Sequence, residues 1–149
     1  MNTSPHADTP PARIPKPKPR ILPETRVFWE AARRHELVIQ QCADCGQRMH
    51  FPRFLCHRCL SENLTYVPSS GRGTVYSFTV VRQAAHPAFE AEVPYVYALI
   101  ELEEGVRMMS NLINISPEEV RIGQPVRVVF TDLGDDTALP CFEPLETPA

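Results

Sequence analysis

Two Cys-x-x-Cys pairs lie close together in the stretch CADCGQRMHFPRFLCHRC, residues 42–59. Four thiolates form a closed tetrahedral zinc site, which leaves no open position for water. Gly46 directly follows the first pair, where a tight turn lets backbone N–H groups point at a thiolate. The spacing therefore predicts a structural zinc ribbon, and its expected ligands are Cys42, Cys45, Cys56 and Cys59.

Other uses of these cysteines are weaker interpretations. A thioredoxin-like redox function needs a single pair at a strand-to-helix junction, not two pairs this close. Iron in a four-sulfur site stays open as a chemical alternative. His50 and His57 lie within the ribbon, and with four cysteines present we expect them to be surface or neighbouring groups. Cys141 stands alone near the C-terminus, and we expect a buried, inert thiol there.

Basic and acidic residues are unevenly distributed. Residues 1–35 hold seven Lys or Arg against three acids, whereas the remainder holds eight arginines against fifteen acids. An acidic body repels nucleic acid phosphates on average. The basic residues Lys16, Lys18 and Arg20 lie in a proline-rich arm, residues 1–23, which cannot form the interior of a helix or sheet. Two interpretations of the arm stay open: a disordered tail, or a segment extended along a partner.

A short amphipathic helix is predicted over residues 23–36. Proline and an acid open it, and apolar side chains follow at helical spacing, namely Val27, Phe28, Ala31 and Ala32. Trp29 lies beside them. The two aromatic residues either cap the core of this chain or dock on a partner. A strand over 37–41 then leads into the first cysteine pair.

After Cys59 the pattern changes to β-strands. Strands are expected over 73–82, 95–102, 106–113, 125–131 and 138–144, with a short helix over 116–123. In the first of these, Tyr76, Phe78 and Val80 are expected on one face. The strand over 95–102 is apolar on both faces, which indicates a central position or a covering ligand or partner. The predicted fold is mainly β: an N-terminal helix, a zinc ribbon and a five-stranded OB-fold barrel.

These elements predict four segments. They are a proline-rich basic arm (1–23), a helix with a lead-in strand (24–41), a zinc ribbon (42–63) and an OB-fold domain (64–149). No apolar run is long enough for a membrane span or a secretory signal, so we expect a cytoplasmic protein. Motifs such as GxSxG, GxGxxG, a Walker loop or HExxH are lacking, and no catalytic residue is predicted. Outside the ribbon, His86 is the histidine best placed for a functional role, because it lies in an irregular loop and such loops often carry function.

The order of these parts resembles the DUF35 family. The resemblance covers about residues 24–143 and depends on the ordered set LVIQQCADCG, FPRFLCHRC, SSGRGTVYSFTVV, VPYVYALIELEEGVRMMSNL and VRIGQPVRVVF. Membership would imply a rubredoxin-like zinc ribbon with an acyl-CoA-associated OB fold. It would also imply a complex with a thiolase-superfamily protein: a thiolase, a hydroxymethylglutaryl-CoA synthase or a lipid-transfer-protein-like aldolase that cleaves steroid side chains.

The leading hypothesis is therefore a non-catalytic accessory subunit of a thiolase-type enzyme that acts on an acyl-CoA. Expected contacts with the partner are Lys16, Lys18, Arg20, Phe28 and Trp29. Expected contacts with the acyl-CoA channel are Arg72, His86 and Phe89, since arginine suits phosphate. The alternatives are a stand-alone acyl-CoA- or lipid-binding module and, less favoured by charge, a nucleic-acid-binding OB protein.

Overall fold

The cysteine-rich half folds around a small three-stranded sheet. The computed structural model describes residues 13–134 and 136–146. Its ribbon strands are β1 (Val38–Cys42), β2 (Arg48–Met49) and β3 (Leu64–Pro68), in the order β2-β1-β3 with antiparallel pairing. β3 pairs with β1 and not with a barrel strand, so the sheet of the ribbon extends past residue 63. The division of the chain into four segments stays a prediction.

The C-terminal half is a closed five-stranded barrel, as predicted. Its strands follow one another around the barrel in the order β4-β5-β6-β8-β7. Antiparallel pairing of β4 with β7 closes the ring, and β6 meets β8 in parallel at Leu112 and Phe142. This five-stranded arrangement is that of an OB fold. The barrel strands are β4 (Arg72–Val81), β5 (Tyr95–Leu102), β6 (Arg107–Leu112), β7 (Pro125–Asp132) and β8 (Ala138–Pro144).

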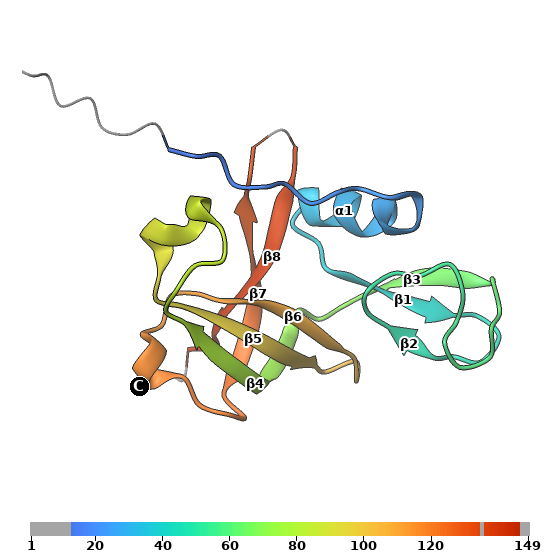
Figure 1. Cartoon of the computed structure of the whole chain (residues 1–149). Coiled ribbons are helices and arrows are strands. Elements are labelled where there is room, and N and C mark those ends of the chain that lie inside the picture. Colours follow the sequence, from blue (N-terminus) through green and yellow to red (C-terminus); the bar gives the residue numbers. More distant parts are fainter. Residues whose placement is uncertain (1–12, 135, 147–149) are drawn as a thin grey trace, which may run out of the picture.

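The N-terminal helix is shorter than expected. A single 3-10 turn, η1 (Pro23–Thr25), leads into α1 (Arg26–Arg33). Figure 1 shows α1 above the junction of the two halves, with the ribbon on one side and the barrel on the other. Two further 3-10 segments are η2 (Pro87–Glu92) and η3 (Pro117–Glu119), so the helix expected over 116–123 is only one short turn. No described helix is long and apolar enough to cross a membrane.

One hydrophobic core joins the helix to the barrel. Ile39 of β1 and Phe28 of α1 belong to the same buried cluster as Ile100 and Phe142 of the barrel. β5 places Val96, Ala98, Ile100 and Leu102 in this core, as its alternation predicted. A second, much smaller cluster surrounds the cysteines and includes Met49. The ribbon therefore has little hydrophobic core of its own.

The predicted face of β4 is wrong at Tyr76. The register with β5 shifts between Val75 and Ser77, as in a β-bulge, and the bulge changes which side chains face inward. Val75 is 1% exposed, whereas Tyr76 is 45% exposed. Phe78, beyond the bulge, packs against the core as expected. Strict alternation in the sequence could not reveal the inserted residue.

Candidate functional site

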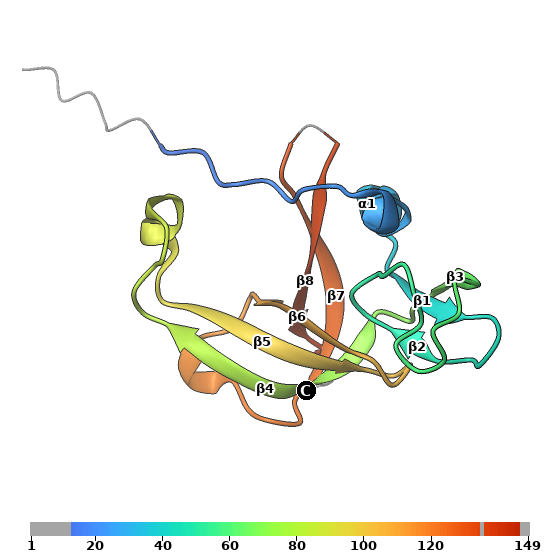
Figure 2. The ribbon, with the colours of Figure 1, turned by 45° about the vertical axis from the view of Figure 1, so that its right-hand side comes forward.

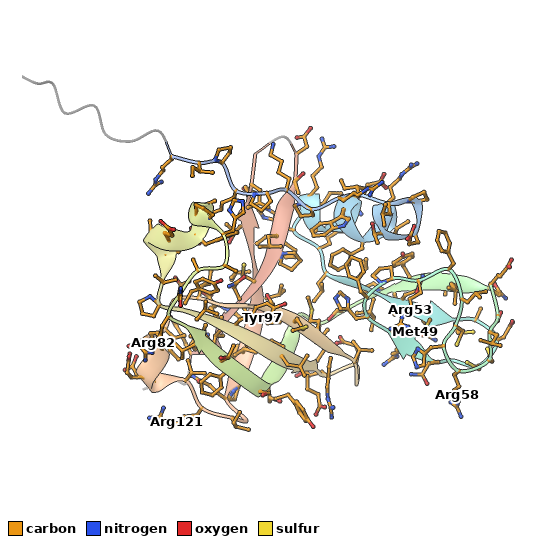
Figure 3. The ribbon with its side chains drawn as sticks, in the orientation of Figure 1. Met49, Arg53, Arg58, Arg82, Tyr97 and Arg121 are labelled. Atoms are coloured by element: carbon orange, nitrogen blue, oxygen red, sulfur yellow. The ribbon has the colours of Figure 1, made fainter. Side chains whose placement is uncertain are left out.

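The four ribbon cysteines converge on one point. Their Sγ atoms all lie within 4.8 Å of one another, and the Cys42–Cys59 and Cys45–Cys56 pairs are each 3.6 Å apart. Ligands at about 2.3 Å from a tetrahedral zinc ion are separated by about 3.8 Å. The described residues thus fit a four-thiolate metal site of structural type. Figure 3 labels Met49, Arg53 and Arg58 in the part of the molecule that contains the ribbon strands β1, β2 and β3.

Two equivalent turns present these sulfur atoms. The N–H of Gly46 donates to the carbonyl of Cys42, and the N–H of Leu60 donates to the carbonyl of Cys56, each at 2.9 Å. Both turns end in left-handed backbone, with φ of 74° at Gly46 and 63° at Leu60. Glycine accepts this conformation freely, whereas leucine adopts it at a cost. The sequence indicated the first turn by its glycine, but nothing comparable marked the second.

The four neighbouring thiols do not ionise alike: the N–H of Cys45 lowers the pKa of Cys42, whereas the pKa of Cys59 is raised. At Cys59, the N–H of Ser61 acts to lower the pKa, but contacts with the other three cysteine sulfurs, together with burial, outweigh it and raise the pKa to about 12. A divalent cation at the centre removes this conflict, because each thiolate then binds positive charge. The arrangement is suited to binding a metal and leaves no thiolate free to act as a nucleophile.

The two histidines of the ribbon differ in their surroundings. His57 is exposed, whereas His50 packs against the ring of Phe28, with ring centroids 5.4 Å apart. Burial lowers the pKa of His50 to about 4. Its Nδ1 is buried without a hydrogen-bond partner among the described residues. His50 is therefore a neutral packing residue between ribbon and helix.

The residues predicted to contact acyl-CoA do not all come together. Arg72 begins β4, whereas His86 and Phe89 follow its far end, so the length of the strand separates them. His86 and Phe89 do lie side by side, with ring centroids 6.2 Å apart, and His86 Nδ1 accepts a hydrogen bond from the N–H of Ala88. Phe89 also lines a cavity of about 550 Å³. A contact of any of these with acyl-CoA stays a prediction.

The residues predicted to contact a partner also divide into two groups. Lys16, Lys18 and Arg20 are exposed on the arm. Phe28 and Trp29, by contrast, are only 3% and 9% exposed, because α1 turns them into the core. Val27, which we grouped with the apolar face, is 45% exposed, so that grouping is wrong: the helix is rotated to bury Trp29 in its place.

A groove of about 420 Å³ runs where the ribbon, α1 and the barrel meet. Sequence reasoning missed it, because its walls come from segments far apart in the chain. Phe28, Trp29 and Phe51 form one side, and Met109 of β6 lies on another, 60% exposed. The Nε1 of Trp29 is buried and has no hydrogen-bond partner in the described part of the chain. A partner group that enters this groove would meet mostly apolar atoms.

A histidine–aspartate pair also escaped prediction. His35 Nε2 lies 2.9 Å from Asp132 Oδ1, and the imidazole stacks on Phe130 with ring centroids 5.2 Å apart. The pair joins the end of α1 to β7 and is exposed. Among the described residues, no Ser, Thr or Cys side chain hydrogen-bonds to a histidine, so this pair lacks a nucleophile. Its role in the structure is to fasten the helix to the barrel.

Taken together, the fold and the cysteine cluster define a protein of the zinc-ribbon and OB-fold class. Models of two domains match the chain in succession. "ChsH2, rubredoxin-like zinc ribbon domain" matches residues 29–65, and "ChsH2, C-terminal OB-fold domain" matches residues 66–131. The DUF35 domain-containing scaffold protein of Methanocaldococcus jannaschii is 37% identical over 76% of this chain and 84% of its own length. The chain belongs to the DUF35 family.

Solved and curated relatives extend this comparison. A chain of the Ltp2-ChsH2(DUF35) aldolase superposes with a TM-score of 0.78 at 40% identity, covering 85% of this chain and 98% of that one. The 3-oxo-4,17-pregnadiene-20-carboxyl-CoA hydratase alpha subunit of Mycobacterium tuberculosis is 43% identical over 87% of this chain. This chain spans only 40% of that relative's length. The benzoylsuccinyl-CoA thiolase subunit BbsA of Geobacter metallireducens is 35% identical over 48% of this chain and 47% of its own length.

Proposed function

We propose that this chain is a non-catalytic accessory subunit of a thiolase-type enzyme that acts on an acyl-CoA. The enzyme is a thiolase, a synthase or a retro-aldol lyase, and the subunit assists assembly and acyl-CoA binding. The observation that carries the proposal is the likeness to the DUF35 chain of the Ltp2-ChsH2(DUF35) aldolase, which covers 98% of that chain. The subunit name of BbsA supports the thiolase side of the proposal.

The chemistry of the described residues agrees with a supporting role. All four sulfur atoms of the cluster would serve as metal ligands, so none remains to attack a substrate. The described histidines have no hydroxyl or thiol partner that they could activate. The reacting groups would therefore belong to the partner chain.

Two surfaces are assigned to the proposed complex. The basic arm at Lys18 and Arg20 and the groove beside Trp29 would face the partner. His86 and Phe89 would lie at the acyl end of the thioester, and Arg72 would interact separately with an anionic group. A structural zinc ion would hold the ribbon in the shape that the partner recognises, in a cytoplasmic compartment that keeps thiols reduced.

Co-expression tests this proposal. The chain and a thiolase-like protein from the same organism are produced together, with an affinity tag on one of them. We expect both to co-elute at a fixed ratio. Cys56→Ser should abolish co-elution, whereas Cys141→Ser, which changes the cysteine outside the cluster, should preserve it. If the two proteins never co-elute and the partner is fully active alone, the accessory function is wrong.

A further inference from the structure

A cavity of about 550 Å³ lies at the end of the barrel where β4 leads into η2. Tyr95 and Tyr97 of β5 and Asn111 of β6 form its floor on the outer face of the sheet. Phe89 of η2 stands at one side, and Leu133 lies on the other, just after β7. Figure 3 labels Tyr97 at the middle of this face. Ligand sites in proteins have volumes of about 300–1,000 Å³, so the cavity is large enough to hold a small molecule.

The cavity is apolar and aromatic. Phe89 and Tyr95 lie with their ring centroids 6.5 Å apart, and aliphatic side chains complete the walls. The carboxylate of Glu92 also lines the cavity, but it forms an ion pair with Lys16. The side chains of Tyr95, Tyr97 and Asn111 make no hydrogen bond within the described residues, so their polar groups are available to a ligand. Such walls favour an uncharged ligand that is mostly apolar and carries a few polar groups.

The part of the N-terminal arm around Lys16 and Pro17 covers this cavity. Figures 1 and 2 both show the arm passing above η2 and alongside the β7–β8 hairpin on its way to α1. Lys16 and Pro17 are part of the lining, and Lys16 Nζ also lies 5.6 Å from the centre of the Phe89 ring. A covered cavity excludes a macromolecule and admits a small one. The arm is therefore part of the site.

The attachment of the arm beside the cavity is weak. Between Arg13 and Pro17, the backbone makes no hydrogen bond to the described part of the barrel. Lys16 and Glu92 have side chains 43% and 44% exposed, and an ion pair this exposed contributes little to stability. A surface cation–π contact adds only a small further attraction. The segment from Arg13 to Pro17 can therefore lift away without disturbing the barrel.

We propose that this cavity binds an uncharged, mostly apolar organic group, and that the arm closes over the bound group as a strap fastened by Lys16. The identity of the ligand rests on the proposed function, because the acyl part of a thioester is a mostly apolar, uncharged group. The covering arm explains why the basic residue Lys16 lies next to an apolar site. It also predicts that opening of the arm limits the entry of the ligand.

Cys141 reports on the opening of the strap. It lines the cavity and is 3% exposed. Burial raises the pKa of its thiol, while the Thr131 hydroxyl and the positive charge of Lys16 act in the opposite direction. Lys16→Ala would thus make Cys141 less acidic and, by chemistry alone, slower to alkylate. Faster alkylation in this variant could come only from greater access to the cavity.

The first experiment measures alkylation of Cys141 by N-ethylmaleimide in the zinc-loaded full chain, followed by mass spectrometry. Lys16→Ala should react about fivefold faster than the wild type, as expected when a weak surface attachment is lost. Lys16→Arg keeps the charge that pairs with Glu92 and should react at the wild-type rate. An unchanged rate in Lys16→Ala would overturn the strap.

The second experiment uses Nile red, a neutral apolar dye, on the chain without a partner. We expect saturable fluorescence enhancement and slower alkylation of Cys141 when the dye is bound. Asn111→Trp should abolish binding by filling the cavity. Met109→Trp, a change on the same face of β6 but in the groove beside α1, should leave it intact. Saturable binding that is unchanged in both variants would contradict the assignment of this cavity as the binding site. Bound dye that does not slow the alkylation of Cys141 would contradict it as well.

These outcomes are separate from those of the proposed function. A chain that co-elutes with a thiolase-type partner but neither binds the dye nor opens faster in Lys16→Ala contradicts the cavity inference alone. A chain that binds the dye with protection of Cys141 but never co-elutes contradicts the accessory function alone. Should Asn111→Trp fail to fold, the Lys16 variants and the protection of Cys141 by dye still decide the question.

Discussion

The Sγ atoms of Cys45 and Cys56 lie 3.6 Å apart, although the two residues are eleven positions apart in the chain. Each belongs to a different Cys-x-x-Cys turn, so the two turns meet sulfur to sulfur. The remaining buried contacts of the ribbon are few, with Met49 and Leu64 next to the cysteines. Stability around the cysteines should therefore depend on the metal, whereas the larger buried cluster, which α1, β1 and the barrel share, contains none of the four cysteines.

Cys56→Ser tests this dependence. Loss of one thiolate should lower the zinc content well below one ion per chain and unfold the ribbon, while barrel signals in a methyl NMR spectrum persist. Elemental analysis measures the zinc. Cys141→Ser is the matched control, because it removes the thiol outside the cluster and should retain zinc. A soluble Cys56→Ser chain that keeps its full metal content would contradict the four-thiolate site.

Two neighbouring positions of α1 distinguish core from surface. Phe28 is 3% exposed and Val27 is 45% exposed. Phe28→Ala should lower the free energy of unfolding by about 3–5 kcal/mol, because a buried aromatic ring is lost. Val27→Ala should change it by about 0.5 kcal/mol or less. Chemical denaturation of the two variants measures both values, and equal effects would show that the helix is not oriented as described.

Acid should destabilise the chain partly through His50. Its folded-state pKa of about 4 lies below the ordinary 6.5, so the unfolded state binds the proton more readily. Stability from this group is complete above about pH 6.5 and is lost as the pH falls toward 4. His50→Phe removes this loss. At saturating zinc, the difference in unfolding free energy between variant and wild type should change by about 3 kcal/mol across that window. A constant difference would contradict the burial of a neutral imidazole.

Gly73 in β4 should tolerate no side chain. A Cβ there would meet the carbonyl oxygen of Glu101 on β5 well inside contact distance, with Ile100 Cγ2 only 3.0 Å away. Both neighbours are held by the barrel, so Gly73→Ala should cost about 1–3 kcal/mol in unfolding free energy. Thr74→Ser, at the next and exposed position, is the control and should have little effect. Thermal unfolding of the two variants makes the comparison, and a Gly73→Ala chain as stable as the control would contradict this close packing.

The elements that depend on local pattern were predictable from the sequence. The cysteine spacing indicated the metal cluster, and alternation indicated the core face of β5 from Val96 to Leu102. Local pattern could not indicate the bulge between Val75 and Ser77, since an inserted residue has no signature of its own. It also could not place Trp29, because only tertiary packing selects which face of a short helix is buried.

The candidate sites show the same limit. The cavity near Lys16 and Glu92 brings together residues 76 positions apart, and no spacing rule relates them. Arg72 and His86 were both expected at the acyl-CoA channel, but Arg72 begins β4 and His86 lies beyond the other end of that strand. Long-range proximity depends on how the barrel closes. For this reason, the four clustered cysteines could be named from sequence, whereas the walls of the cavity and the groove could not.

Reconstitution of activity tests the central claim most directly. The purified thiolase-type partner is assayed for carbon–carbon bond formation or cleavage on its acyl-CoA while this chain is titrated in. We expect the chain alone to show no turnover, and partner activity to rise and then level off at a fixed ratio of the two proteins. Turnover by the chain alone, or partner activity that is complete and unchanged throughout the titration, would contradict the account.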